Sequence, residues 1–443
     1  MDAEHTCSAL ITDLYELTMA AAYWEHDMRA RATFSLYLRH RPERGYFVAA
    51  GLEPALKILQ GLRFHDEDIR YLTRTGLFTS PFLEYLRTLR FSGEVRALPE
   101  GTLFFADEPI LEVTAPMIEA QLLETILINT IGLHTLLATK AARCISVARG
   151  RTLVDFALRR TQGIDAGMAL ARSTYLAGFD GTSNVAAAKR YNIPAVGTMA
   201  HSFIQAFRDE TAAFEAYARS YPGRTVLLID TYDTLQGARN AVQVANRMAA
   251  AGDALVGVRL DSGDIIAMSR EVRRIFDAAG LPQVKIFASS GFDEYEVSRA
   301  IEQGAAIDAF GIGTKVGVSA DLPYLDMVYK LVRYDKRDVR KLSSGKENLA
   351  GEKQVFRRSG ADGTYQEDIV GLRSDAIDVA DALLVTVMRD GQPMGPSPAL
   401  DQIRRDFTER FSRLGDAYKH LSMPQRYPVK LSRALSALQK QTE

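Results

Sequence analysis

Continuous apolar runs recur through the middle of the sequence, each followed by polar and glycine residues and then by a helical pattern. The runs are Leu153–Phe156, Ala195–Val196, Val226–Ile229, Leu255–Leu260, Val284–Ala288 and Ile307–Phe310. An uninterrupted apolar run is typical of a parallel strand that is covered on both faces. Repeated strand–loop–helix units predict a (β/α) barrel, with an open doubly wound sheet as the alternative. We favour an irregular barrel, because no Gly-x-Gly-x-x-Gly motif opens the first unit and only about seven strands are found where eight are usual.

The N-terminal part of the sequence lacks this repeat and mixes a helix with strands. A helix is predicted over residues 12–24, with Thr12 or Asp13 as its N-cap. The apolar side chains of this helix that can face inward are Leu14, Leu17, Met19 and Ala21. The strands expected after it are 32–38 and a hairpin made of 93–98, 102–105 and 110–113.

Beyond residue 331 the character changes again, with many Lys, Arg and Gly residues between 333 and 358. The strands expected here are 339–342, 354–357, 365–372 and 383–388, and a polar helix is expected from Pro398. This part is more similar to the N-terminal part than to the middle. We therefore predict an α/β protein in which a barrel, residues 119–331, is inserted into an α+β domain formed by residues 1–118 and 332–443. The basic segment 333–358 either covers the site as a lid or holds the two domains together.

Composition excludes several classes of function. The 443 residues are 47% apolar and 25% charged with a formal charge of −1, so nothing favours a nucleic acid or an anionic membrane as partner. Cys7 and Cys144 are the only cysteines, which excludes a disulfide framework and fits a reducing cytoplasm. Residues 1–5 lack the basic start of a signal peptide. The apolar segment 125–139 is too short and too interrupted to span a bilayer, so a buried helix is expected.

Two late strands of the predicted barrel are followed by residues suited to phosphate. Gly311-Ile-Gly313-Thr314 offers unobstructed backbone amides and a hydroxyl. Ser289-Ser290-Gly291 leads into a helix, with Asp293 three residues after Ser290 as in a capping box. Ordinary capped turns are the alternative. We favour phosphate binding by Ser290, Gly291, Gly313 and Thr314, because the last two strands of barrels commonly hold a phosphate together.

A cation and several carboxylates follow two earlier strands. Arg259-Leu-Asp261-Ser-Gly-Asp264 could be an exposed ion-pair cluster. However, Arg259 falls within a strand expected to be buried, where an unpaired guanidinium is costly, so a functional anion is expected beside it. Asp230 and Asp233 repeat the carboxylates one strand earlier. Such acids can hold phosphates through Mg²⁺ or stabilise a developing cation.

Three further polar turns complete the predicted rim. Arg159, Arg160 and Gln162 follow the first strand, and arginine suits bidentate binding of carboxylate or phosphate. Gly178–Asn184 is a polar turn expected at the next strand end. Gly197–Phe203 places His201 at a strand-to-helix turn, as a base, metal ligand, phosphate acceptor or simply a buried histidine. Together the turns favour a polyanionic substrate.

Eight motifs occur in an order that resembles the nicotinate phosphoribosyltransferase family. They are Thr12-Asp-Leu-Tyr15-Glu-Leu-Thr-Met, Arg159-Arg-x-Gln-Gly163, Gly178-Phe-Asp-Gly-Thr-Ser-Asn184, Gly197-Thr-Met-Ala-His201-Ser, Asp230-Thr-Tyr-Asp233, Arg259-Leu-Asp-Ser-Gly-Asp264, Gly311-Ile-Gly-Thr314 and Lys353-Gln-Val-Phe356. The resemblance runs from about residue 12 to about residue 358 and is weak beyond. Ala157 departs from it, because glycine is common there, and the chain lacks the C-terminal cysteines of members with a zinc appendage.

This resemblance implies the reaction. Nicotinate and phosphoribosyl pyrophosphate would give nicotinate mononucleotide and pyrophosphate, in salvage synthesis of NAD, with Mg²⁺ as cofactor and ATP as hydrolysed co-substrate. His201 matches the histidine that ATP phosphorylates, with Asp261 as a second catalytic residue. The residues expected to bind nicotinate are Tyr15, Phe156, Arg159, Thr198 and Arg259. Those expected on the phosphate and Mg-pyrophosphate side are Ser290, Gly291, Gly313, Thr314, Asp230 and Asp264.

The resemblance also implies a cytoplasmic homodimer, in which Tyr15 stacks on the pyridine ring bound by the neighbouring subunit. Nicotinate's nitrogen needs no deprotonation, so His201 is interpreted as a phosphate acceptor and not as a base.

Four alternatives stay open at this point. The substrate could be nicotinamide, if the arginines are all occupied by phosphates. Quinolinate phosphoribosyltransferase has a related architecture but is typically shorter and lacks the histidine motif. A non-catalytic nucleotide-binding barrel would predict broken rim motifs, and these are intact. A Schiff-base lyase or aldolase needs a buried lysine at a strand end, for which Lys285 and Lys315 are the near candidates.

Overall fold

The computed structural model describes residues 9–343 and 345–442 and divides the chain into two compact units. The first unit combines Met1–Thr139 with Tyr324–Glu443, and the second is Lys140–Pro323. Cys7 and the N-terminal residues 1–5, on which two sequence expectations rest, lie outside the described residues. Cys144 is buried and free.

Within its described residues, the first unit contains three sheets of mainly antiparallel strands. Its strands are β1 (Arg31–Leu38), β2 (Phe47–Val48), β3 (Glu94–Ala97), β4 (Leu103–Phe104), β5 (Pro109–Pro116), β12 (Met327–Tyr334), β13 (Arg337–Asp338), β14 (Lys353–Ser359), β15 (Tyr365–Leu372), β16 (Asp381–Ala382), β17 (Val385–Arg389), β18 (Gln392–Pro393) and β19 (Val429–Leu431). Its helices are α1 (Leu14–Glu25), α2 (Leu52–Gly61), α3 (Asp66–Thr75), α4 (Ser80–Thr88), α5 (Met117–Gln121), α15 (Leu400–Ser412), α16 (Asp416–Lys419) and α17 (Arg433–Gln441).

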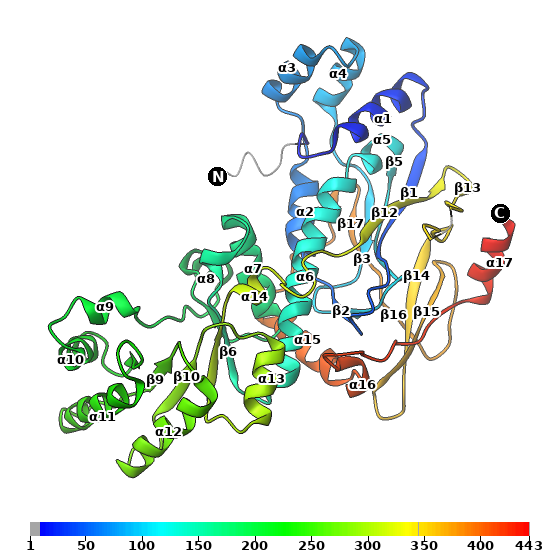
Figure 1. Ribbon diagram of the computed structural model, residues 1–443. Helices are drawn as coiled ribbons and strands as arrows, with labels where there is room; N and C mark the ends of the chain where they lie inside the picture. The colour runs from blue at the N-terminus through cyan, green and yellow to red at the C-terminus, as the bar shows by residue number, and fades with distance from the viewer. Residues whose placement is uncertain (1–8, 344, 443) are drawn as a thin grey trace. The chain divides into compact units, whose positions relative to one another are not determined.

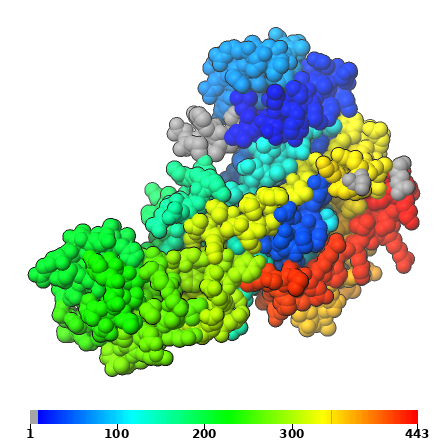
Figure 2. All heavy atoms as spheres, viewed as in Figure 1, coloured from blue at the N-terminus to red at the C-terminus, as the bar shows by residue number. Residues whose placement is uncertain are grey.

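The two ends of the chain build the first unit together. The sheet order is β13-β12-β1-β5-β3-β17-β18, and β1 pairs antiparallel with both β5 and β12. In Figures 1 and 2 the N-terminal segment (blue to cyan) and the C-terminal segment (yellow to red) therefore pack against each other. A second sheet has the order β16-β14-β15-β19, and β2 pairs with β4. Buried apolar side chains of β1, β3, β5 and α1–α5 form the core of this unit.

Helix α6 (Glu124–Ala148) continues from the first unit into the second. By length and composition alone, the stretch Met117–Ala148 could cross a membrane, but 56% of its most apolar window is buried inside the protein. Leu127 and Ala138 are fully buried, and such burial is typical of the core helix of a globular protein. The predicted buried helix is confirmed.

The second unit is built on a parallel sheet. Its strands are β6 (Thr152–Asp155), β7 (Gly181–Thr182), β8 (Val226–Leu228), β9 (Gly257–Leu260), β10 (Lys285–Ala288) and β11 (Ala309–Ile312). Its helices are a 3₁₀ turn at Leu158–Arg160, α7 (Ile164–Leu176), α8 (Val185–Tyr191), α9 (His201–Gln205), α10 (Glu210–Ser220), α11 (Thr234–Ala250), α12 (Ile265–Ala278), α13 (Glu294–Glu302) and α14 (Thr314–Gly317). The strand order is β7-β6-β11-β10-β9-β8, and every pair is parallel. The predicted mixed α/β fold with a parallel sheet is confirmed.

One predicted turn of this sheet contains a short strand, and one predicted strand is wrong. Gly178–Asn184 is not only a turn, because its centre, Gly181–Thr182, is the edge strand β7. Ala195–Val196 does not form a full strand and makes a single parallel bridge from Ala195 to Thr182. Neither segment has enough successive residues paired with a neighbouring strand to form a longer strand. Val196 N nevertheless donates a hydrogen bond to Thr182 O at 2.9 Å.

The predicted hairpin of the first unit is also wrong. β3 pairs with β5, whereas β4 pairs with β2 from much earlier in the chain. Phe104 of β4 packs on Phe47 of β2 with ring centroids 5.5 Å apart, and both rings are buried. The pairings of β4 with β2 and of β3 with β5 bury this aromatic pair and alternate side chains of β3. This burial outweighs the advantage of pairing β3 with β4, which are close in sequence.

Two smaller expectations at the ends of the chain fail. Residues 339–342 form no strand, because the Lys341 amide donates to the side chain of Asn348 at 2.7 Å instead of to a neighbouring strand. Helix α1 begins after Asp13 as predicted and buries Leu17, but Leu14 is 55% exposed. The helix therefore turns a narrower apolar face to the core than the sequence pattern indicates.

Candidate active site

Chemically active side chains gather where the parallel strands of the second unit end. Because parallel strands end at the same edge of a sheet, loops far apart in sequence meet there. Asp155 ends β6, Arg259 lies in β9 with Asp261 just after it, and Ser289 follows β10. The turn after β8 contributes Asp230 and Thr231.

His201 is the first residue of α9 and is held between two of these loops. Its Nδ1 lies 3.1 Å from Thr231 Oγ1, and its Nε2 lies 3.7 Å from Asp261 Oδ2. The side chain remains 35% exposed. The imidazole is therefore oriented on both sides yet accessible, unlike a histidine that only fills a core.

Asp261 and Asp230 are linked by a chain of hydrogen bonds. One oxygen of Asp230 accepts from the Asp261 amide at 2.8 Å and from Ser262 Oγ at 2.7 Å. Asp261 Oδ1 in turn accepts from Ser289 Oγ. The other oxygen of Asp230 is buried and has no protein partner among the described residues. A buried carboxylate oxygen without a donor is the kind of group that a cation satisfies.

Arg259 places a half-buried positive charge in β9. One guanidinium nitrogen donates to Thr198 Oγ1, whereas Nε is buried without a partner among the described residues. Burial lowers the pKa of Arg259, and the nearby Arg159 adds to this effect while Asp261 opposes it. A guanidinium has only donors, so its free N–H requires an acceptor such as a carboxylate or phosphate oxygen.

A cavity of about 280 Å³ opens beside Arg259 and Thr198. Phe156 also lines it and lies against Gly311, where an added Cβ would come within 2.5 Å of the Phe156 ring. The absence of a side chain at Gly311 thus makes room for the Phe156 ring beside the backbone of β11. The volume is near the lower end for small-ligand sites, and the mixture of aromatic, apolar and few polar groups is typical of them.

Asp155 supports the site without facing it. Its two oxygens accept from the Ala157 amide at 2.8 Å and from Thr182 Oγ1 at 2.7 Å. Burial raises the pKa of this carboxyl, and the two hydrogen bonds oppose the shift. These bonds join the ends of β6 and β7, so the polar residues after β6 have a structural anchor.

Two predicted acidic residues cap helices. Asp264 accepts from the Ala267 amide as N-cap of α12. Asp293 accepts from two amides as N-cap of α13, so the expected capping box starting at Ser290 is wrong. The cap position explains both carboxylates by local structure. Of the predicted acids, Asp230 and Asp261 are brought together beside His201.

The predicted phosphate turns have distinct backbone conformations. Ser290 and Gly291 both have positive φ, +85° and +71°, directly after Ser289. Positive φ at a serine is strained, and such residues cluster at functional sites. Gly313 is the N-cap of α14, which begins at Thr314. Phosphate binding at these turns stays a prediction.

Arg159 and Tyr15 complete the predicted residues. Arg159 is exposed in the 3₁₀ turn after β6. Tyr15 belongs to α1 of the first unit and is 46% exposed. Burial and the neighbouring carboxylate of Glu124 raise the pKa of its hydroxyl, so it stays protonated.

A buried ionic network that sequence reasoning missed lies behind the turn after β10. Lys140 Nζ is 2.6 Å from Glu294 and 2.7 Å from Asp321, and Arg143 Nε is 2.8 Å from Glu294. Glu294 is the first residue of α13 and is fully buried. In the sequence, the signal for this network was the pair of cations, Lys140 and Arg143, in a mostly apolar helical segment.

Sequence reasoning also did not single out Thr231 and Ser289 as site residues, because a single hydroxyl residue forms no distinctive sequence pattern.

These features define the class of protein: an α/β enzyme whose candidate site lies on loops after parallel strands. Family models match most of the chain, namely the nicotinate phosphoribosyltransferase N-terminal domain at residues 10–132, the nicotinate phosphoribosyltransferase family at 152–355 and its C-terminal domain at 373–439. The chain therefore belongs to the nicotinate phosphoribosyltransferase family, and the resemblance predicted from its motifs is confirmed.

Relatives and solved structures agree with this assignment. The chain is 48% identical over 398 residues to a nicotinate phosphoribosyltransferase of Mycobacterium tuberculosis, covering 89% of this chain and 85% of the relative. It is 38% identical to the enzyme of that name from Bacillus subtilis, covering 96% and 93%. The crystal structure of human nicotinic acid phosphoribosyltransferase matches with a TM-score of 0.88 at 31% identity, covering 97% of this chain and 99% of that one.

Proposed function

We propose that this protein condenses nicotinate with phosphoribosyl pyrophosphate to give nicotinate mononucleotide and pyrophosphate, as a cytoplasmic step of NAD salvage. Family membership supports the reaction. The observation that carries the assignment of the site is His201, held between Thr231 and Asp261, with the half-buried Arg259 close to the same Asp261. This arrangement combines a reactive nitrogen with a receptor for anions.

We further propose that the parallel sheet belongs to an irregular (β/α) barrel and that each compact unit is a domain. The segment bridged to β7 at Ala195 would provide the strand beyond β7. Val196 and Val226 line the same cavity, which supports closure between that segment and β8.

Nicotinate would lie in the cavity beside Phe156. The unpaired N–H of Arg259 and the hydroxyl of Thr198 would receive its carboxylate, so that the ring nitrogen faces the sugar. This nitrogen already has a lone pair, and its attack on the anomeric carbon breaks the bond to pyrophosphate. The chain must therefore orient two anions and needs no general base.

His201 would accept a phosphoryl group from ATP. Thr231 lies within hydrogen-bond distance of Nδ1, whereas Asp261 Oδ2 is 3.7 Å from Nε2, beyond that distance, so Nε2 would be the nitrogen that attacks. Its lone pair would form the bond to phosphorus while ADP leaves, and the Nδ1 proton would remain on the side of Thr231. Asp261 would orient the ring and stabilise its positive charge during transfer.

The residues present fit a Mg²⁺ ion that arrives with substrate. The donors would be the unpaired oxygen of Asp230 and the carboxylate of Asp261. Residues 9–343 and 345–442 contain no cluster of three or more His, Cys, Asp or Glu that could hold a metal, so phosphate oxygens of the substrate would have to supply the further ligands. The bound ion would neutralise the leaving pyrophosphate.

A product assay tests the reaction. Pyrophosphate release would be measured with nicotinate or nicotinamide, each with and without ATP. We expect turnover of nicotinate that ATP increases, and much slower turnover of nicotinamide, because a neutral amide leaves Arg259 without an anion. Equal turnover of the two pyridines would reject the substrate assignment.

Labelling tests the role of His201. Incubation with γ-labelled ATP should leave acid-labile label on the protein and none on His201→Ala. His420→Ala, at an exposed histidine in the first unit, serves as the matched control and should label normally. Equal labelling of His201→Ala and the control would assign the phosphate to another residue.

A further inference from the structure

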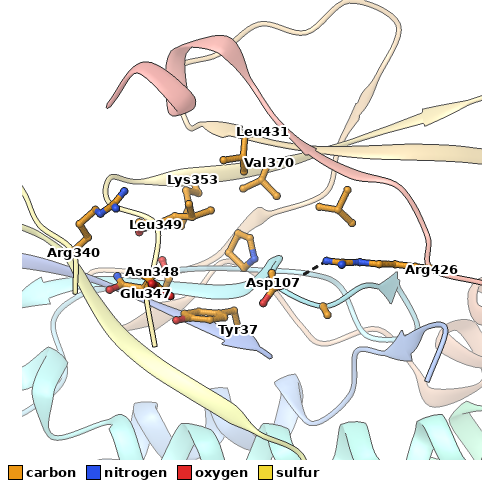
Figure 3. Close-up of a pocket in the computed structure, with 14 residues that line it drawn as sticks. Tyr37, Asp107, Arg340, Glu347, Asn348, Leu349, Lys353, Val370, Arg426 and Leu431 are labelled. Carbon is orange, nitrogen blue, oxygen red and sulfur yellow. Dashed lines mark hydrogen bonds and ion pairs between the residues drawn. The ribbon is translucent and has the colours of Figure 1, made fainter. Parts of the chain in front are cut away.

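A second cavity, of about 300 Å³, lies within the first unit, between its two larger sheets (Figure 3). β1 and β5 form one wall, and β14, β15 and β19 form the other. Residues of the segment between β13 and β14 close it. Part of the basic segment 333–358 therefore lines a cavity inside this unit.

Two polar groups in this cavity have no protein partner among the described residues. Tyr37 is only 9% exposed, and its hydroxyl is buried without a hydrogen bond. Burial raises the pKa of Tyr37 to about 12, so the hydroxyl is a donor at neutral pH. Arg340 donates through Nη1 to the carbonyl and side chain of Gln439, but its Nε is buried and free.

The other charges of the cavity have partners or face solvent. Lys353 is buried, lies 3.4 Å from Glu112 and donates to the carbonyls of Leu349 and Gly351. Asp107 and Arg426 form the ion pair drawn in Figure 3, 3.9 Å apart. Glu347 is exposed. What remains is a phenol O–H and a guanidinium N–H in a cavity that the apolar side chains of Val370, Val429 and Leu431 also line.

We propose that this cavity binds a small organic carboxylate with an apolar body. Arginine only donates, and the buried Nε–H of the half-buried Arg340 has no acceptor, so an anionic oxygen of a ligand would satisfy it. Tyr37 would donate to the same carboxylate. The body of the ligand would lie on Val370 and Leu431, which a phosphate ion would leave uncovered.

Photo-crosslinking on the whole chain tests this. The probe is a short aliphatic carboxylate that carries a diazirine, and its control is the amine of the same chain length. We expect label from the carboxylate on peptides of β15 and β19, with about tenfold less label on Tyr37→Phe and on Arg340→Gln, because each loses a donor to a charged group. The amine should label these peptides weakly.

The turnover of nicotinate by Tyr37→Phe serves as the folding control and should be unchanged. Three results would overturn the proposal: no label on β15 or β19, equal labelling by the amine, or label that both variants retain. A cavity that holds only water would give the first result. Label on peptides of the second unit reports the candidate active site separately and leaves this test unaffected.

Discussion

His201 takes its surroundings from residues far away in the sequence. Thr231 and Asp261 follow different strands of the parallel sheet and contact opposite sides of one ring. The motif around His201 indicated a histidine at a strand-to-helix turn, but it could not identify these partners. Their positions depend on how β8 and β9 pair, which is a property of the sheet.

Aspartates in similar sequence settings have different roles. Asp230 accepts hydrogen bonds from the next loop, whereas Asp233, three residues later, caps α11. Asp264 caps α12 although Asp261, three residues earlier, faces His201. The spacing Asp-x-x-Asp thus places the first carboxylate in the site and the second on a helix end. Sequence alone predicted the strand ends, but not this division.

Glu108 provides a prediction about pH. Its side chain is fully buried, and one oxygen accepts from the Phe105 amide at 3.0 Å. Burial, and then the nearby Asp368, raise the pKa of Glu108 well above its ordinary value. The folded state thus binds this proton more tightly than the unfolded state. The corresponding stability is complete below the unfolded pKa, about 4.3, and is lost as pH rises through the folded pKa.

We therefore expect Glu108→Gln to lose less stability than the wild type as pH increases. The free energy of unfolding would be measured by urea denaturation at about pH 5 and about pH 8. Glu25→Gln, at an exposed position of α1, is the matched control and should follow the wild type. A parallel decline of all three proteins would show that Glu108 does not contribute.

At the scale of the elements, the packing of a helix against a strand end determines whether a glycine in that helix can be replaced by a larger residue. Gly237 of α11 lies so near the end of β8 that an added Cβ would come within 2.0 Å of the Ile229 carbonyl. Gly132 of α6 has as its nearest neighbour Met327 Sδ, at 3.9 Å from such a Cβ. Both glycines lie inside helices, so helix propensity alone would favour alanine at each position.

We expect opposite effects from the two substitutions. Gly237→Ala should destabilise the protein by about 3 kcal/mol, because backbone atoms of Ile229, just after β8, must move to admit the methyl group. Gly132→Ala should be neutral or stabilise by up to about 1 kcal/mol. Thermal and urea unfolding measure both. A stable Gly237→Ala would mean that α11 can move away from the sheet.

Sequence patterns predicted the buried parallel strands well and the short antiparallel pairs poorly. The runs at β6, β8, β9, β10 and β11 were found within about two residues, because strands buried on both faces are apolar throughout. β3 and β4 were read as partners because they are adjacent in sequence, yet each pairs elsewhere. Short runs carry too little pattern to specify a partner.

The first unit requires both ends of the chain to fold. Ala32 of β1 pairs with Tyr334 of β12, and Lys353 Nζ lies beside Glu112 of β5. Such distant pairings close long loops before they gain contacts, so we expect this unit to be slow to form. The second unit is continuous in sequence and is formed by neighbouring strand–helix repeats.

A complementation experiment tests the homodimer that the family resemblance implies. If Tyr15 acts in the site of the neighbouring subunit, Tyr15→Ala and His201→Ala should each be nearly inactive. Refolded together, they should recover about a quarter of the wild-type turnover, because half of the dimers are mixed and each mixed dimer has one intact site. Sedimentation would establish the dimer independently. Mixtures that stay inactive, although dimers form, would place Tyr15 and His201 in the same subunit's site.

The sequence by itself determined the family, the parallel strands and the loops that carry polar residues. These properties are local: motif spacing, apolar runs and turn residues act over a few neighbouring positions. The tertiary structure decided the partners of His201, the pairing of β3 and β4, and the cavity at Tyr37 and Arg340. Long-range pairing follows from the surface buried by the whole unit, which no single stretch of sequence specifies.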